Sequence, residues 1–278
     1  MKIAISIDSA CDMPQELKQK YNIFTMPYYV MLGEKECVDG VDVTANDLFE
    51  YVKQTGILPK TAAISADKFK EYFKNILKDY DEVIHITLSH QMTSSGINAI
   101  TGSEGLKVYV VDSKSLSSGI ALLVLQCAKM VEEGKLTASE IVEKLNAMIP
   151  RVQASFLVDT LTYLYKGGRC SSVALIGSKI LKIKPKILVK DGKMEVVKKY
   201  MGNINNCLIK YVEDTLAGNN PDKSIAFCTH SSKMEISERI CQKLREFGFK
   251  EVYDVDASST ISSHCGPGTL GILFMNKE

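Results

Sequence analysis

The chain has 278 residues, more than most single domains contain, and its 45% hydrophobic content is enough for a substantial core. Lysine and arginine number 34 and aspartate and glutamate 33, so the net charge of +1 supplies no global field that would draw in nucleic acid or an anionic membrane. We therefore expect two domains and a small or apolar ligand, and no nucleic-acid partner.

The sequence shows no signal peptide, no membrane-spanning run and no metal-binding motif. Asp8 interrupts the first apolar run before it reaches signal-peptide length, and nowhere do about 18 apolar residues follow one another. We therefore expect a cytoplasmic protein without stable membrane insertion. The eight cysteines include no CxxC pair, which favours reduced, mostly buried thiols, and the four histidines show no paired ligand spacing. We predict neither a metal nor a cofactor.

The first half of the chain repeats a strand, a hydroxyl-rich turn and a helix. Apolar runs at residues 3–7, 83–88 and 108–111 each lead into a turn that contains serine, and a helical pattern follows, the first one capped by Asp12. Repeated βα units predict a parallel sheet, whose carboxyl edge is the usual ligand site of open α/β folds. The serines of these turns should therefore lie near one another: Ser9, Ser95 and Ser113.

The pattern changes after a helix that opens with the capping box of Thr137 and Glu140 and should end near Pro150. We place the domain boundary there, with an N-terminal α/β domain at residues 1–150 and a C-terminal α+β domain at residues 151–278. Asp191-Gly192 joins two runs into a predicted hairpin with a type I′ turn, and hence antiparallel sheet. Lysines concentrated between residues 179 and 199 fit a solvated strand face. The remaining predicted elements are helices at residues 206–216 and 236–247 and strands at residues 225–227 and 272–274.

The turn at residues 93–96 precedes a helix and contains Ser95. Its backbone N–H groups and hydroxyls can bind a carboxylate or phosphate at the helix N-terminus. Simple N-capping by Ser94 or Ser95 is the alternative. Serine, histidine and aspartate are all present in the chain, but no GxSxG motif supports a hydrolase.

Two further candidates flank glycine-rich turns in the second domain. Arg169 follows Gly167-Gly168, between an apolar helical stretch and another that begins near Ser171, and should be exposed. Arginine suits bidentate contacts with a carboxylate or phosphate, and binding of helix-end carbonyls is the alternative. His264 precedes a formal GxGxxG, but a strand rather than a helix follows that motif, so we expect no dinucleotide site. His264 itself is either an anion donor or a structural residue.

Short blocks, taken in order along the chain, resemble the DegV family. Their order and spacing extend from Ile3 almost to the C-terminus. The blocks are Ile-Asp-Ser at residues 7–9, Thr61, Ser95-Gly96, Val-Asp-Ser at residues 111–113, Leu-x-Tyr-Leu-x-Lys-Gly-Gly-Arg at residues 161–169, Ile-Lys-Pro-x-Ile at residues 183–187 and His-x-Gly-Pro-Gly at residues 264–268.

The resemblance implies a non-enzymatic protein that binds a long-chain fatty acid in a deep apolar tunnel between its two domains. Some members of the family are the lipid-carrying subunit of a bacterial fatty acid kinase, in which a separate ATP-binding subunit phosphorylates the bound carboxylate. By position, the resemblance assigns carboxylate contacts to Thr61 and Ser95. It places His264 close by and Arg169 near the opening.

The sequence departs from the family pattern in two places. Ala62-Ala63 stands where members commonly have Ser-Gln, and no arginine follows the hairpin at residues 200–203, where members often have one. The second departure leaves storage or transfer as an alternative to a kinase partnership. A hydrolase or phosphotransferase that uses Ser95 and His264 on acyl or phosphate esters is the runner-up, and a regulatory module without ligand is a third reading. The motifs leave the ligand's chain length, its unsaturation and the oligomeric state open.

Overall fold

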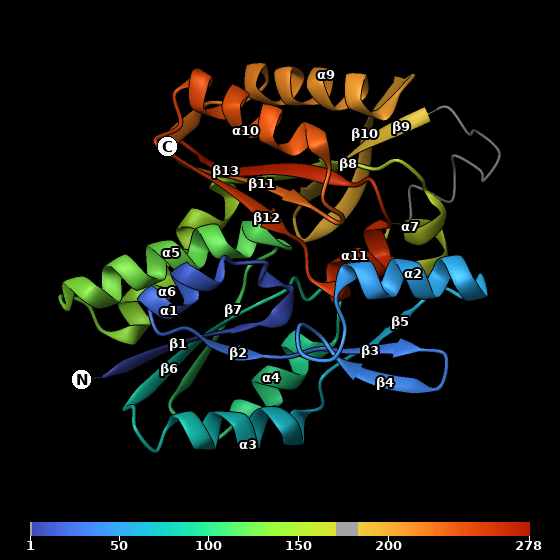
Figure 1. The fold of residues 1–278 in the computed structure, drawn as a ribbon. Coiled ribbons are helices and arrows are strands. Elements are labelled where there is room, and N and C mark those ends of the chain that lie inside the picture. Colours follow the sequence, from blue (N-terminus) through green and yellow to red (C-terminus); the bar gives the residue numbers. More distant parts are fainter. Residues whose placement is uncertain (1, 171–182) are drawn as a thin grey trace.

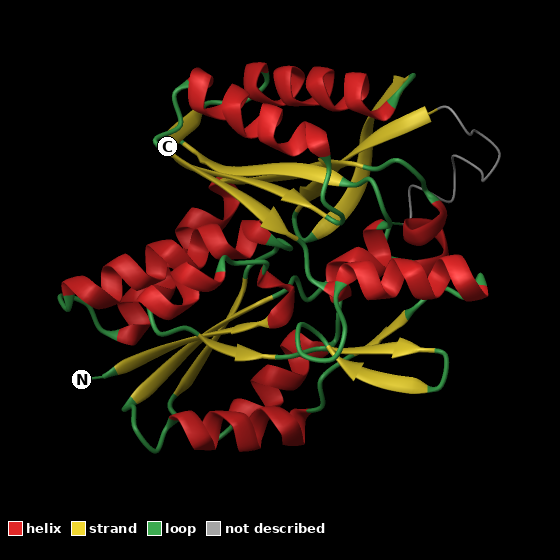
Figure 2. Cartoon of the chain, viewed as in Figure 1, coloured by secondary structure: helices red, strands yellow, loops and turns green. Residues whose placement is uncertain are grey.

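A computed structural model describes residues 2–170 and 183–278 (Figure 1). The described strands form two large sheets and one small one, and helices cover the outer faces of the large sheets and fill the space between them (Figure 2). The helix that we expected to begin near Ser171 lies outside the described residues. In the described part of the chain, no helix combines the length and apolar character needed to cross a bilayer.

The N-terminal sheet is parallel throughout, as the repeated βα pattern predicted, with strand order β2-β1-β6-β7. Its strands are β1 (Ile3–Asp8), β2 (Phe24–Met26), β6 (Glu82–Thr87) and β7 (Val108–Asp112). The associated helices are α1 (Gln15–Lys20), α3 (Ala66–Ile76), α4 (Ser95–Ser103), α5 (Ser118–Glu133) and α6 (Ala138–Met148), with short 3-10 turns η1 (Ser9–Cys11) and η2 (Ile149–Arg151).

The prediction that Asp12 is the N-cap of the first helix is wrong. Asp12 has a φ of 46° and ends η1, whereas α1 begins after Pro14 without a side-chain cap. The carboxylate of Asp12 instead accepts hydrogen bonds from Ser117 Oγ at 2.5 Å and from Ser258 N at 2.9 Å. Asp12 therefore connects segments far apart in the sequence instead of capping its own helix.

A small antiparallel sheet, not expected from the sequence, lies beside the parallel one. Its order is β4-β3-β5, formed by β3 (Tyr29–Leu32), β4 (Lys35–Val38) and β5 (Lys60–Ala62). Helix α2 (Ala45–Thr55) connects β4 to β5 and starts with a capping box between Thr44 and Asp47. This sheet holds Thr61 in register with Val30 of β3.

The C-terminal sheet has the order β10-β9-β8-β13-β11-β12, and all its pairs are antiparallel except β11 with β12. The predicted hairpin is confirmed, since Asp191 and Gly192 have φ values of 49° and 80°, as a type I′ turn requires. The strands are β8 (Val152–Leu157), β9 (Ile183–Lys190), β10 (Lys193–Met201), β11 (Pro221–His230), β12 (Glu251–Asp256) and β13 (Leu270–Asn276). The helices are α7 (Thr162–Gly167), α9 (Ile204–Ala217), α10 (Glu235–Phe247) and α11 (Ser259–Cys265).

Helix α5 lies between the two large sheets and contacts strands of both (Figure 1). All residues from Ser118 to Leu125 are buried, because a helix between two sheets has no solvent face in that stretch. The strands of the parallel sheet all precede residue 150, and those of the C-terminal sheet all follow it. The domain boundary near Pro150 nevertheless stays a prediction, since α5 packs on both sides of it.

Candidate functional site

A cavity that offers water about 90 Å³ of space lies between the two large sheets. Apolar side chains form much of its wall, among them Leu88, Met92, Leu116, Met194 and Ile261. This volume is below the roughly 300–1,000 Å³ typical of small-molecule sites, so a long-chain ligand would have to displace wall side chains as it enters. The wall itself is apolar enough for an extended aliphatic ligand.

The cavity has an apolar inner end and a polar outer end. A second, smaller space, lined mostly by apolar atoms, shares the wall residues Leu116, Ile261 and Cys265 with it. On the other side, Thr61, Arg169 and His264 line both the cavity and a depression at the surface. A long ligand would thus meet hydroxyl, imidazole and guanidinium groups at the end nearest to solvent.

Thr61 and His264 form the centre of the polar end. Thr61 lies on β5 and His264 near the end of α11, and the distance from Thr61 Oγ1 to His264 Nε2 is 2.8 Å. Burial, helped by the nearby positive charge of Arg169, lowers the pKa of His264 to about 4, so the imidazole is neutral at neutral pH. When His264 donates from Nε2, the hydroxyl proton of Thr61 remains for a ligand.

Two buried polar atoms at this end of the cavity have no hydrogen-bond partner among the described residues. They are Nδ1 of His264, which lies against Gly167, and Oγ1 of Thr260. Thr260 lines the cavity one helical turn before His264, so both side chains project from the same face of α11. Buried polar groups without partners are uncommon in proteins and point to a missing hydrogen-bonding ligand.

Thr260 was not singled out from the sequence. Thr260 precedes His264 by four residues, a spacing that places two side chains on one face of a helix. The serine-rich sequence around Thr260, however, did not indicate a helix. The structure shows how α11 is held in place, because the carboxylate of Asp39 accepts hydrogen bonds from the backbone N–H groups of Ser259 and Thr260. Ser258 caps the helix, accepting from Ile261 N.

Ser95 lies behind the cavity wall instead of on it. Its side chain is 1% exposed, and Oγ accepts hydrogen bonds from Ile64 N at 3.0 Å and from Thr93 Oγ1 at 3.1 Å. The neighbouring Thr93 and Ser94 do line the cavity. Ser94 is the N-cap residue of α4, but its side chain makes no capping hydrogen bond. Ser95 therefore connects α4 to the segment that follows β5, and β5 is the strand on which Thr61 lies.

The other two serines of the sheet edge have different partners from Ser95. Ser9 Oγ donates to Asp39 and accepts from Tyr28 N, and Ser113 bonds with Ser115. The structure thus places all three serines after strands of the parallel sheet, but each serves a separate local contact.

Tyr28 is a further lining residue that sequence reasoning missed. Its ring is buried, its hydroxyl lies 3.4 Å from Asp8 Oδ2, and it also interacts with Ser95 and Thr93. Burial raises the pKa of Asp8 to about 7 although Leu88 N donates to its carboxylate. Tyr28 consequently connects the cavity to a buried carboxyl group that titrates near neutral pH.

Arg169 lines both the cavity and the surface depression, and its side chain contacts a helix-end carbonyl, the structural alternative. The guanidinium donates from Nη1 to the carbonyl of Gly167 at 2.6 Å, and the residue is exposed. Lys60 and Lys166 line the same surface depression, so three cationic side chains surround the opening. This region is electropositive although the whole chain is nearly neutral.

The pairing of His264 with Thr61 does not assemble the catalytic pair of a serine hydrolase. Such an enzyme requires a hydrogen bond between the nucleophilic hydroxyl and the general base. Here the Ser95 hydroxyl accepts from Ile64 N and Thr93 instead. The geometry is better suited to holding an anion than to activating Ser95.

The chain has relatives along its full length. A family model matches residues 2–277 of the chain, and its description reads "Uncharacterised protein, DegV family". A DegV domain-containing protein of Caldanaerobacter subterraneus is 31% identical over 282 residues, covering 99% of each chain.

Two solved structures share the fold. DegV of Bacillus subtilis, described as a fatty acid binding protein, has a TM-score of 0.86 at 26% identity and full coverage of both chains. A stearic acid-binding protein of Eubacterium ventriosum has a TM-score of 0.88 at 25% identity, covering 99% of this chain and 98% of its own. These likenesses extend over both sheets. The chain therefore belongs to the DegV family.

Proposed function

We propose that this protein binds a long-chain fatty acid, with the tail in the apolar cavity and the carboxylate at the polar outer end. The observation that carries the proposal is the buried, unpartnered hydroxyl of Thr260 beside the hydrogen-bonded Thr61 and His264, at one end of an apolar space. The fatty acid binding of the Bacillus and Eubacterium proteins supports it.

The tail would supply most of the affinity. A sixteen-carbon acid has about fourteen methylenes, and burying each contributes about 0.8 kcal/mol, or on the order of 11 kcal/mol before ordering costs. Two or three hydrogen bonds to the carboxylate, at about 1.5–3 kcal/mol each, mainly offset its desolvation. The head group therefore sets the orientation of the ligand in the cavity more than its affinity.

The carboxylate would be held mainly by neutral donors. Thr61 and Thr260 carry hydroxyls that can donate to it, and His264, neutral at neutral pH, donates from Nε2 to Thr61 and so frees the Thr61 proton for the ligand. Arg169 provides the nearest positive charge at the opening, where Lys60 and Lys166 add to it. Ser95 supports this arrangement from behind through Ile64 N, so its role is the positioning of Thr61 and its neighbours.

A finer proposal is that the protein presents the bound acid to a separate ATP-dependent kinase subunit. The kinase would transfer the γ-phosphoryl group of ATP to a carboxylate oxygen, which gives an acyl phosphate and ADP. The cationic opening suits the approach of a phosphate. Because residues 200–203 contain no arginine, storage or transfer of the acid is the alternative role.

Native mass spectrometry of the purified protein, followed by lipid extraction, tests the binding proposal. We expect one fatty acid per chain, retained without turnover. A protein that carries no lipid and does not bind an added long-chain acid would contradict the proposal and favour a module without ligand. Hydrolysis of acyl or phosphate esters by the protein alone, abolished in Ser95→Ala, would favour the enzyme reading.

The kinase step is tested by adding a bacterial fatty acid kinase subunit and ATP to the loaded protein. Formation of acyl phosphate, trapped with hydroxylamine, would support presentation to a kinase. Retained binding without acyl phosphate would restrict the function to storage or transfer.

A further inference from the structure

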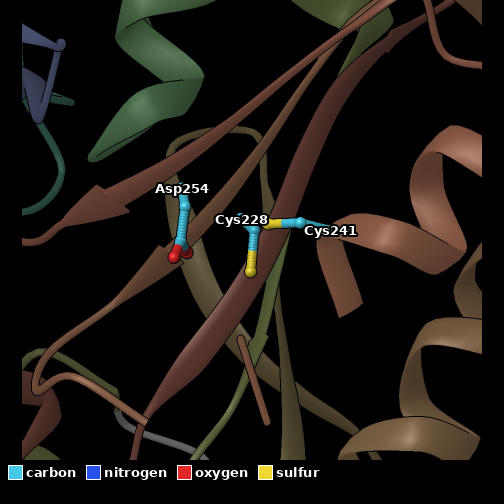
Figure 3. Close-up of side chains that lie close together, drawn as sticks. All are labelled: Cys228, Cys241 and Asp254. Carbon is cyan, nitrogen blue, oxygen red and sulfur yellow. The ribbon is translucent and has the colours of Figure 1, made fainter. Parts of the chain in front are cut away.

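Three potential metal ligands converge on the outer side of the C-terminal sheet, away from the lipid cavity. Cys228 lies on β11, Asp254 on β12 and Cys241 on α10 (Figure 3). Their two sulfur atoms and a carboxylate oxygen all lie within 4.8 Å of one another. Cys228 and Asp254 are direct partners in the parallel pair of β11 and β12, so their side chains project to the same face.

We propose that Cys228, Cys241 and Asp254 form a site for a thiophilic divalent cation of the Zn²⁺ type. Tetrahedral zinc with bonds of about 2.3 Å to sulfur and about 2.1 Å to oxygen holds its ligand atoms about 3.6–3.8 Å apart. The separations in the cluster need contract by no more than about 1 Å to reach this geometry, which side-chain rotation alone can provide. Two thiolates favour zinc over magnesium or calcium, which prefer oxygen ligands.

The surroundings of Asp254 match the outer shell of a metal site. His230 Nε2 lies 3.2 Å from Asp254 Oδ1, and Ser237 Oγ donates to Oδ2 at 3.1 Å. The carboxylate is therefore oriented by two hydrogen-bonding side chains, as ligating carboxylates usually are.

The thiols are buried, whereas the carboxylate reaches solvent. Cys228 and Cys241 are 0% and 2% exposed, and the side chain of Asp254 is 40% exposed. A bound cation would compensate the two thiolates and displace their protons. On the solvent-exposed side of the cluster, a water molecule can occupy the fourth coordination position of the metal.

The cluster is separate from the fatty acid site, although one strand contributes to both. Along β11, Cys228 and His230 point to the α10 side, whereas Thr229 and the following Ser231 line the inner apolar space. Tests of metal binding and of lipid binding are therefore independent of each other.

Titration of the full-length, reduced protein with Co²⁺ tests the proposal. We expect one equivalent to produce a thiolate-to-cobalt charge-transfer band with tetrahedral d–d absorption, and Zn²⁺ to displace it. Cys228→Ser and Cys241→Ser should remove the band, and Asp254→Asn should weaken Co²⁺ binding more than about 10-fold. Cys207→Ser, a buried cysteine of the same domain outside the cluster, should retain the band.

Asp254→Asn keeps the proposal testable if a buried Cys→Ser variant fails to fold, because it is conservative and partly exposed. Circular dichroism of each variant checks the fold. Zn²⁺ should also raise the midpoint of thermal unfolding of the original protein but not of Asp254→Asn. No charge-transfer band with the folded protein, a band that persists in folded Cys228→Ser, or an unchanged Co²⁺ affinity in Asp254→Asn would overturn the proposal.

Discussion

Replacing Thr61 with valine removes one hydroxyl from the outer end of the cavity while keeping the shape of the side chain. In the proposed complex that hydroxyl donates to the carboxylate, while its oxygen stays 2.8 Å from His264 Nε2. A hydrogen bond to a charged group contributes about 1.5–3 kcal/mol, so the Kd for a sixteen-carbon acid should rise about 10- to 150-fold. The methyl ester offers only a neutral acceptor, and its Kd should rise about 2- to 12-fold.

Isothermal titration calorimetry with the acid and the ester measures both losses. Thr101→Val is the matched control, because Thr101 is exposed on α4 and is not among the lining residues. Its affinities should not change. Equal losses for acid and ester in Thr61→Val would indicate altered packing, and unchanged affinity for the acid would place the head group at the other end of the cavity.

Further predictions concern the residues around the cavity. Ser95→Ala should lower the free energy of unfolding by about 1–3 kcal/mol in denaturant titrations, because Ile64 N loses its buried acceptor. His264→Ala should weaken binding of the acid more than of its methyl ester in the same calorimetric assay. The pKa of His264 falls from 6.5 to about 4 on folding, so its contribution to stability is complete above about pH 6.5. That contribution should be lost as the pH falls toward 4, on the order of 3 kcal/mol, and His264→Ala should flatten this part of the stability profile. Gly96→Ala should destabilise the fold by about 1–3 kcal/mol in thermal melts, since a Cβ would lie 2.0 Å from His90 Cδ2.

The parts of the fold that were predictable have strong local signals. Continuous apolar runs identified the parallel strands, and Asp191-Gly192 specified its turn because both residues must adopt positive φ. The small sheet was missed because β5 has only three residues and is stabilised by pairing with β3, not by its own sequence. Strand β12 was missed because its charged residues, Glu251 and Asp254 among them, hide the apolar alternation.

The site was less predictable, because its geometry depends on contacts between distant segments. Thr61 and His264 are 203 residues apart in sequence and bond directly in the structure. The sequence suggested Ser95 as a carboxylate donor, but burial behind the wall depends on the packing of α4 against the segment after β5. Thr260 lies on a serine-rich helix with low intrinsic propensity, which is held by Asp39 from the N-terminal half of the chain.

Strand β10 lies at one edge of the C-terminal sheet, and its composition bears on self-association. An edge strand has unpaired backbone groups that can pair with a second molecule. Val197 and Met201 on this strand are 47% and 75% exposed, which would favour such pairing. The register is irregular between Val196 and Lys198, and lysines are interspersed along the strand, so charge repulsion and the local distortion both oppose it. Among the described residues, the lysines of β10 and its irregular register therefore disfavour the addition of a strand from a second molecule.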